Sequence, residues 1–331
     1  MRTRTRPKPT STALLLVAAA AAFPSNAAQR LSEDFSNPPQ QSGWIRFGDT
    51  QLSRWNSEGQ HLEFTWDSSR PNSGIAHRLP RVMTDKDDLA FAFDLELLSH
   101  EVGVDPVRPS TFQIAAGLVR LDAVRSPDYV RGALPGPRDT LEWTWFGAKD
   151  PIAASISPTV IPSDGRLPWG YADSFVTLEV GTRYRFDVQY TASDRTLRLR
   201  MRAGSEPGPS LDSIVLPPEF TGFSVDAFAI CSYSAQGQHP LFGGSVLARA
   251  VVDNVLITVP APPVELIRID GKQVSFRATK GWRYRLEASG DLQDWSVVDT
   301  VEPTEDGVVR MSDLRDAVFR EQFYRVRAVR P

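Results

Sequence analysis

The chain has 331 residues, of which 41% are hydrophobic and 23% are charged, and its formal net charge at pH 7 is −3. This composition is typical of a globular protein and excludes a disordered or membrane-spanning chain, while the length allows about two domains with sizeable cores. The charge balance leaves no basic surplus that would point to nucleic acid or an acidic polymer as partner.

The first 27 residues have the pattern of a secretory signal peptide. A basic leader comes first, made of Arg2, Arg4, Arg6 and Lys8. An apolar run follows from Ala13 to Phe23, and Ser25-x-Ala27 offers a cleavage site. This run is shorter than the roughly 20 residues that a membrane span needs. We therefore expect a mature chain that starts near Ala28, carries no membrane span, and is periplasmic, cell-surface or extracellular. Cleavage lowers the basic count from 37 to 33 against 40 acidic residues, which gives a charge of −7.

Beyond the leader, short apolar runs alternate with clusters of Gly, Pro, Asn, Asp and Ser. This spacing is typical of β-strands and their turns, so the expected fold class is all-β. The runs between residues 28 and 259 predict two stacked antiparallel sheets, because one open sheet of that size would leave a large apolar face in water.

Two of these runs show clearly which side chains face the core. In "FDLEL", Phe93 and the two leucines that follow it at period two are expected to point inward, while Asp94 and Glu96 point outward. In "LEWTWFG", Trp143 and Trp145 share one face at period two. We interpret these two tryptophans as core residues and not as a platform for a sugar.

A proline-rich segment divides the chain. "VPAPPVE" spans residues 259–265, and proline cannot donate to a sheet ladder, so residues 260–264 are expected to form a stiff linker. Residues 28–259 then form the first domain. Residues 265–331 contain further short runs and predict a smaller β-sandwich.

The first domain resembles the concanavalin A-like lectin/glucanase jelly roll of the laminin G type. The resemblance is carried by an acidic-Phe-Ser segment at Asp34 to Ser36 before "GW" at residues 43–44, by the hairpin pattern of residues 184–201, and by the closing run "VVDNVLI" at residues 251–257. It implies a jelly-roll β-sandwich, a fold often used to bind carbohydrate.

The C-terminal segment is similar to a small fibronectin III-like module of exported bacterial proteins. The matching positions are Tyr284, Ser289, Asp291, Leu292, Trp295, Asp316 and Phe323 to Val326. This similarity implies a fold and no activity, with Trp295 and Tyr324 as core aromatic residues.

A catalytic function in glycan hydrolysis would depend on carboxylate side chains. Retaining glycoside hydrolysis needs two carboxyl groups about 5–5.5 Å apart, which period-two spacing on a strand provides. The E-x-D-x-x-E strand motif of jelly-roll glucanases is absent from the sequence. The candidates that remain are Asp94, Glu96, Glu142 and Asp187, which a hydrolase or lyase would gather on the concave sheet.

The loop from Ser163 to Ser174 is the predicted ligand site. Its aromatic residues are not explained by strand packing, and exposed rings offer flat faces for sugars beside polar groups that bond hydroxyls. The candidates are Trp169, Tyr171, Asp164, Arg166 and Asp173. The alternative is a loop that folds back and caps the sandwich.

A structural calcium ion is the one cofactor the sequence suggests. In jelly rolls the first and last strands lie side by side, so Glu33 or Asp34 could meet Asp253 and Asn254. Their oxygen atoms are the hard ligands that calcium prefers.

These observations favour an exported, non-catalytic binding or cell-envelope interaction protein. Its expected partner is a polysaccharide or glycoconjugate, with another envelope protein as the further candidate and no nucleic acid. The alternatives are a glycan-degrading hydrolase or lyase and a purely structural surface protein. Carbohydrate is an expectation from the fold and not from chemistry seen in these residues.

Overall fold

The computed structural model describes residues 28–104, 113–126, 129, 138–148, 153–166, 170–234, 245–315 and 322–329. The predicted signal peptide, Trp169 and Asp316 lie outside these residues. The chain divides into two compact units, the first from Arg30 to Val259 and the second from Pro260 onward. No helix in the described ranges is long and apolar enough to cross a membrane.

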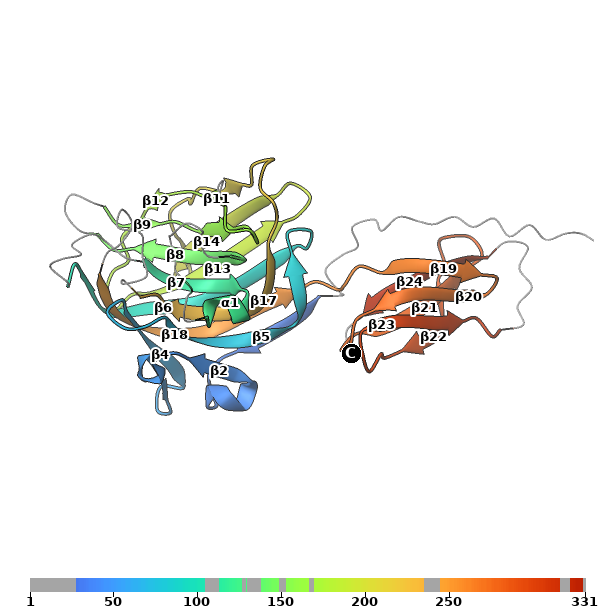
Figure 1. Ribbon diagram of the computed structural model, residues 1–331, viewed down its shortest axis with the longest axis horizontal. Coiled ribbons are helices and arrows are strands. Elements are labelled where there is room, and N and C mark those ends of the chain that lie inside the picture. Colours follow the sequence, from blue (N-terminus) through green and yellow to red (C-terminus); the bar gives the residue numbers. More distant parts are fainter. Residues whose placement is uncertain are drawn as a thin grey trace, which may run out of the picture. The chain divides into compact units, whose positions relative to one another are not determined.

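The first unit is a jelly-roll β-sandwich of two antiparallel sheets (Figure 1). Nine described strands form the first, here sheet A, in the order β15-β14-β13-β6-β18-β4-β3, with β1 on β18 and β16 on β14. They are β1 (Gln29–Glu33), β3 (Ser53–Asn56), β4 (His61–Asp67), β6 (Leu89–Val102), β13 (Arg183–Thr191), β14 (Thr196–Ala203), β15 (Glu206–Pro207), β16 (Ile214–Val215) and β18 (Val246–Val259).

Sheet B also has nine described strands, in the order β11-β10-β8-β7-β17-β5-β2, with β9 on β8 and β12 on β9. They are β2 (Trp44–Phe47), β5 (Ser73–Thr84), β7 (Gln113–Val119), β8 (Thr140–Phe146), β9 (Ser155–Ile156), β10 (Thr159–Ile161), β11 (Gly170–Tyr171), β12 (Ser174–Phe175) and β17 (Ser224–Ser232). The described helical turns are η2 (Pro39–Ser42), η3 (Thr50–Leu52) and α1 (Leu121–Val124).

The core lies between the two sheets and is rich in aromatic rings. Trp143 of sheet B is fully buried, and its ring centroid lies 5.3 Å from that of Phe93 and 4.5 Å from that of Phe186, both in sheet A. Trp145 is buried too, and its Nε1 donates to the carbonyl oxygen of Val176 at 3.0 Å. The predicted core role of both tryptophans and the inward direction of Phe93 are confirmed.

The second unit contains two three-stranded antiparallel sheets. One has the order β19-β20-β23 and the other β22-β21-β24. Their bounds are β19 (Glu265–Asp270), β20 (Gln273–Ala278), β21 (Arg283–Ser289), β22 (Ser296–Val301), β23 (Gly307–Ser312) and β24 (Phe323–Val329).

The aromatic core of this unit differs from the expected one. Among the described residues of this unit, the fully buried rings are Phe276, Trp282 and Tyr284. Trp295 is half-buried instead, and the guanidinium of Arg325 lies 4.0 Å from its ring centroid. The expectation that Trp295 belongs to the core is wrong, because this side chain is held at the surface by a cation–π contact.

Each unit contains the same tyrosine turn, which the alternation of apolar and polar residues does not indicate. The pattern Gly-x-Arg-Tyr-Arg occurs at residues 181–185 and again at 281–285, and both glycines have positive φ, which favours glycine. The Tyr184 hydroxyl accepts a hydrogen bond from the backbone N–H five residues earlier at 3.1 Å, and Tyr284 does the same at 2.8 Å. The turn fixes the start of β13 and of β21.

Candidate functional site

Three of the four candidate carboxylates lie on the outer face of sheet A, where each meets an arginine. Asp94 and Arg185 are opposite each other on β6 and β13, with Oδ1 and Nη1 3.1 Å apart. Glu96 is opposite Arg183, with Oε2 3.5 Å from Nε. Asp187 lies 3.8 Å from Arg185. Opposite charges across strands stabilise a sheet, so this face is an ion-paired surface.

The fourth candidate, Glu142, belongs to sheet B. It lies on β8, next to the inward-facing Trp143, so its side chain points to the outer face of that sheet. The two sheets are separated by the core. The expectation that Glu142 gathers on one concave sheet with Asp94, Glu96 and Asp187 is therefore wrong.

Glu142 nonetheless has a chemical partner that the sequence did not reveal. The Tyr233 hydroxyl donates a hydrogen bond to Glu142 Oε1, and both side chains are buried. The Tyr233 ring stacks on Tyr129 with centroids 5.8 Å apart. The strand position beside Glu142 is Gly117, where an added Cβ would lie 2.4 Å from the backbone oxygen of Leu141. Close approach of the backbone requires glycine here.

The outer face of sheet B continues from Glu142 to the predicted ligand loop. Thr159 of β10 is directly opposite Glu142 on one side and Tyr171 of β11 on the other. Residues directly opposite on neighbouring strands share a face, so Tyr171 lies on the same side as Glu142. Tyr171 is 64% exposed. The preceding residue, Gly170, is closely packed, since a Cβ there would lie 2.4 Å from Leu216 Cδ2.

A second exposed ring lies on this face. Phe175 of β12 is 78% exposed, and it is opposite Ser155, which is in turn opposite Phe146 of β8. Phe146 and Glu142 are four residues apart on one strand and share a face, so the rings of Tyr171 and Phe175 are separated by roughly 13 Å along the strand direction. We call this pair the aromatic edge.

The polar members of the predicted loop are at the surface. Asp164 and Arg166 form a turn in which the Arg166 backbone N–H donates to Asp164 Oδ1 at 3.0 Å, and both are exposed. Asp173 is exposed and lies between Tyr171 and Phe175 in the chain. Trp169 is outside the described residues.

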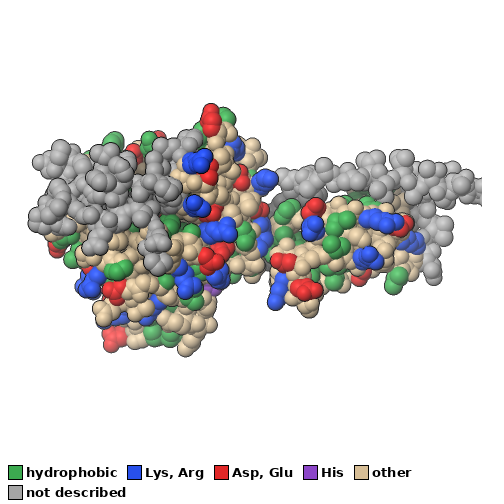
Figure 2. Space-filling view, in the orientation of Figure 1, with side chains coloured by type: hydrophobic (Ala, Val, Ile, Leu, Met, Phe, Trp, Pro, Cys, Tyr) green, Lys and Arg blue, Asp and Glu red, His purple; other side chains and the backbone are tan. Residues whose placement is uncertain are grey.

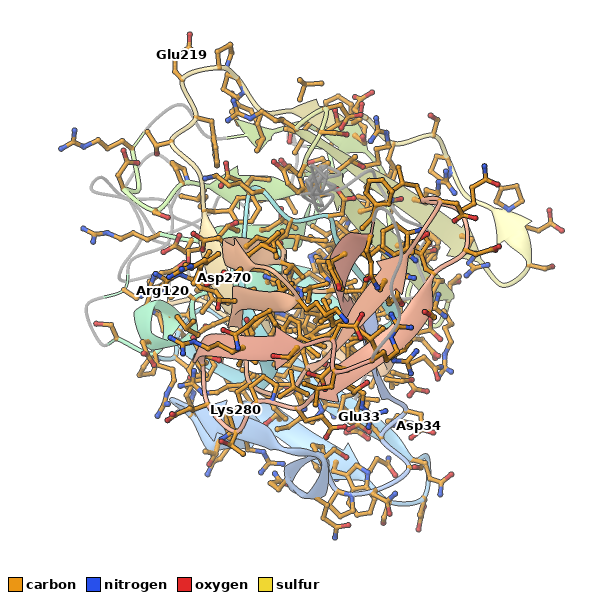
Figure 3. All side chains as sticks on the ribbon, turned by 90° about the vertical axis from the view of Figure 1, so that its right-hand side faces the viewer. Glu33, Asp34, Arg120, Glu219, Asp270 and Lys280 are labelled. Atoms are coloured by element: carbon orange, nitrogen blue, oxygen red, sulfur yellow. The ribbon has the colours of Figure 1, made fainter. Side chains whose placement is uncertain are left out.

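The proposed calcium ligands are held by other partners. Glu33 and Asp34 lie where β1 ends (Figure 3), and β1 pairs with β18, which carries Asp253. Glu33 Oε2 accepts a hydrogen bond from Trp44 Nε1 at 3.1 Å, and Asp253 lies 3.6 Å from Arg183. Burial raises the pKa of the Asp253 carboxyl. Within the described ranges no group of three or more His, Cys, Asp or Glu residues is placed to hold a metal, and calcium stays a prediction.

No protein-family model and no curated protein matches the chain. Among solved structures it is similar to a peanut lectin with a 9mer peptide (12% identity, TM-score 0.43, 69% of this chain and 98% of the lectin) and to a Lotus tetragonolobus seed lectin (11%, 0.45, 71% and 100%). It is also similar to the alginate lyase Aly36B (14%, 0.42, 71% and 97%).

Proposed function

We propose that this protein is an exported, non-catalytic carbohydrate-binding protein whose ligand site is the aromatic edge of sheet B. The observation that carries the proposal is the exposure of Tyr171 and Phe175 on one face. Large exposed rings on an anchored sheet edge lose hydration when a flat apolar partner covers them. The flat faces of sugar rings are such partners.

Polar groups beside the rings support the same ligand class. Asp173 lies between them in the chain, and Asp164 and Arg166 are exposed in the preceding turn. Binding sites for small polar ligands combine apolar surface with a few polar groups that fix orientation. Sugar hydroxyls would accept from Arg166 and donate to the carboxylates.

The remaining parts of the proposal follow the sequence. The first 27 residues would direct export, and residues 260–264 would link the sandwich to the second unit. The second unit would be a fibronectin III-like spacer, which its division into two three-stranded sheets supports. A glycan or glycoconjugate of the cell envelope would be the partner.

Glycan cleavage is the second candidate, and the contact between Tyr233 and Glu142 favours it. A tyrosine hydroxyl held by a carboxylate has the means to move a proton. Both side chains are fully buried, however, so a glycan does not reach them in this structure. Replacing Tyr233 by Phe should remove any release of unsaturated or reducing ends while leaving glycan retention unchanged. Product formation that persists in Y233F would exclude this pair.

The binding proposal is tested with the double variant Tyr171→Ala, Phe175→Ala. We expect at least about tenfold weaker retention on a polysaccharide array, equivalent to about 1.4 kcal/mol. The melting temperature should be unchanged, because exposed substitutions usually alter stability by less than about 0.5 kcal/mol. Val308→Ala, at an exposed apolar position of the second unit, is the matched control and should bind as the parent does. Unchanged retention in the double variant would remove the aromatic edge as the site.

A further inference from the structure

A hollow of about 520 Å³ lies on the outer face of sheet A, on the other side of the sandwich from the aromatic edge. Its floor is low because two alanines, Ala90 and Ala92, occupy the outward positions of β6 at this point. Leu256 and Thr258 of β18 are opposite these alanines and complete the floor. Further along β6, the next outward positions carry the charged residues Asp94 and Glu96.

The wall on the β14 side is a ladder of arginines. Arg198, Arg200 and Arg202 alternate along that strand, so their Cα atoms are about 6.7 Å apart and all three side chains line the hollow. Each is exposed. Asp187 of β13 is directly opposite Arg200 on one neighbouring strand and Ala92 on the other. Gln189 lies two residues further along β13 and faces the same side.

Carboxylates of the protein neutralise the positive charge of the hollow only in part. Three guanidinium groups meet a single lining carboxylate, that of Asp187, whose oxygen lies 3.8 Å from Arg202. Arg198 bonds to Asp194 at the end of the strand. Arg200 makes no hydrogen bond or ion pair with any described residue. On the face of the molecule that Figure 2 shows, basic and acidic side chains lie side by side.

We propose that this hollow binds an acidic polysaccharide, whose carboxylate or sulfate groups pair with Arg200 and Arg202. A guanidinium presents its donors in a planar fork that matches both anionic groups. A row of charges at regular spacing suits an extended polymer with a repeated anionic group better than a single small ion. Gln189 and Thr258 supply neutral donors and acceptors for hydroxyls.

The lining disfavours nucleic acid as the occupant. Single-stranded nucleic acids are bound by stacking of bases on exposed aromatic rings. The aromatic residue of the lining, Phe91, is 2% exposed and points into the core. The net charge of −3 for the whole chain does not argue against an acidic ligand, because the excess positive charge is local.

The test compares binding of the full chain to polygalacturonate, dextran sulfate, neutral dextran and oligothymidylate over a salt series. We expect the two acidic polysaccharides to bind with an affinity that falls as the salt concentration rises. Tighter binding of polygalacturonate would identify carboxylate as the preferred group, and tighter binding of dextran sulfate would identify sulfate. The triple variant Arg198→Gln, Arg200→Gln, Arg202→Gln should bind them at least about tenfold more weakly.

Two controls separate the hollow from general charge. The triple variant Arg268→Gln, Arg277→Gln, Arg310→Gln removes the same number of exposed charges from the second unit and should bind as the parent does. Ala90→Phe fills the hollow without changing charge and should weaken binding, whereas Thr65→Phe, outward on β4 of the same sheet, should not.

The proposal is overturned if neither acidic polysaccharide binds, if both arginine triple variants lose affinity equally, or if oligothymidylate binds as well as the polysaccharides. It does not depend on the aromatic edge. The variant Tyr171→Ala, Phe175→Ala should retain binding of acidic polysaccharide to sheet A. A result that excludes one of the two sites therefore does not exclude the other.

Discussion

Replacing Trp143 by Ala is expected to lower the free energy of unfolding of the first unit by about 3–5 kcal/mol, the range for deletion of a buried large aromatic side chain. Trp143 is fully buried between the sheets against Phe93 and Phe186. Its indole N–H has no hydrogen-bond partner among the described residues, so its contribution is packing and burial alone. Denaturant unfolding followed by circular dichroism measures the loss.

The conservative variant gives the contrast. Trp143→Phe keeps a ring in the same place and removes an unpaired buried donor, so it should cost less than about 1.5 kcal/mol. Leu98→Ala, at an exposed position of β6, should have almost no effect. A Trp143→Ala variant as stable as Leu98→Ala would contradict the packing described for the core.

Alternation along a strand was sufficient to predict which side chains face the core. "FDLEL" and "LEWTWFG" place their large apolar residues at period two, and Phe93, Trp143 and Trp145 are buried as expected. The alternation of apolar and polar residues does not indicate which sheet a strand joins. Asp94 and Glu142 are both polar alternates of long strands, yet they lie on opposite sheets, since pairing of β6 with β13 and of β8 with β7 is non-local.

The candidate sites also depend on contacts between residues that are distant in the chain, which alternation along a strand does not predict. Tyr171 was identified because loop aromatics are not explained by period-two packing, and it is exposed. Phe175 begins the run "FVTLEV", which resembles a packed strand, but β12 contains just Ser174 and Phe175 and the ring is exposed. The alternating arginines of "LRLRMR", residues 197–202, have the sequence pattern of an ordinary solvated strand face. Their hollow depends on Ala90 and Ala92, which are about 100 residues distant in the chain.

Replacing Asp313 by Ala is expected to destabilise the second unit by about 3 kcal/mol. The Asp313 carboxylate is 1% exposed. It accepts two hydrogen bonds from Arg315, from Nε and Nη2, both at 2.9 Å. It also accepts one from Gln322 Nε2 at 3.0 Å and one from the Tyr324 hydroxyl at 3.3 Å. Its loss leaves these donors without their acceptor. A unit of this size has a stability of roughly 3–10 kcal/mol, so a large part of it is lost. Hydrogen exchange of peptides from β21 and β24 measures the effect, and peptides of the first unit serve as the internal control.

The same carboxylate makes the second unit sensitive to acid. Hydrogen bonds from Arg315 lower the pKa of Asp313 from 3.8 to about 2. Because the folded-state pKa lies below the unfolded one, the stabilisation is fully present above about pH 4 and is lost as the pH falls toward 2. We expect the protection factors of the β21 amides, which correct for the intrinsic pH dependence of exchange, to fall over this window in the parent chain and to change less in Asp313→Ala, which has no carboxyl to protonate there. Parallel acid dependence in the two chains would assign the acid sensitivity to other carboxylates of the unit.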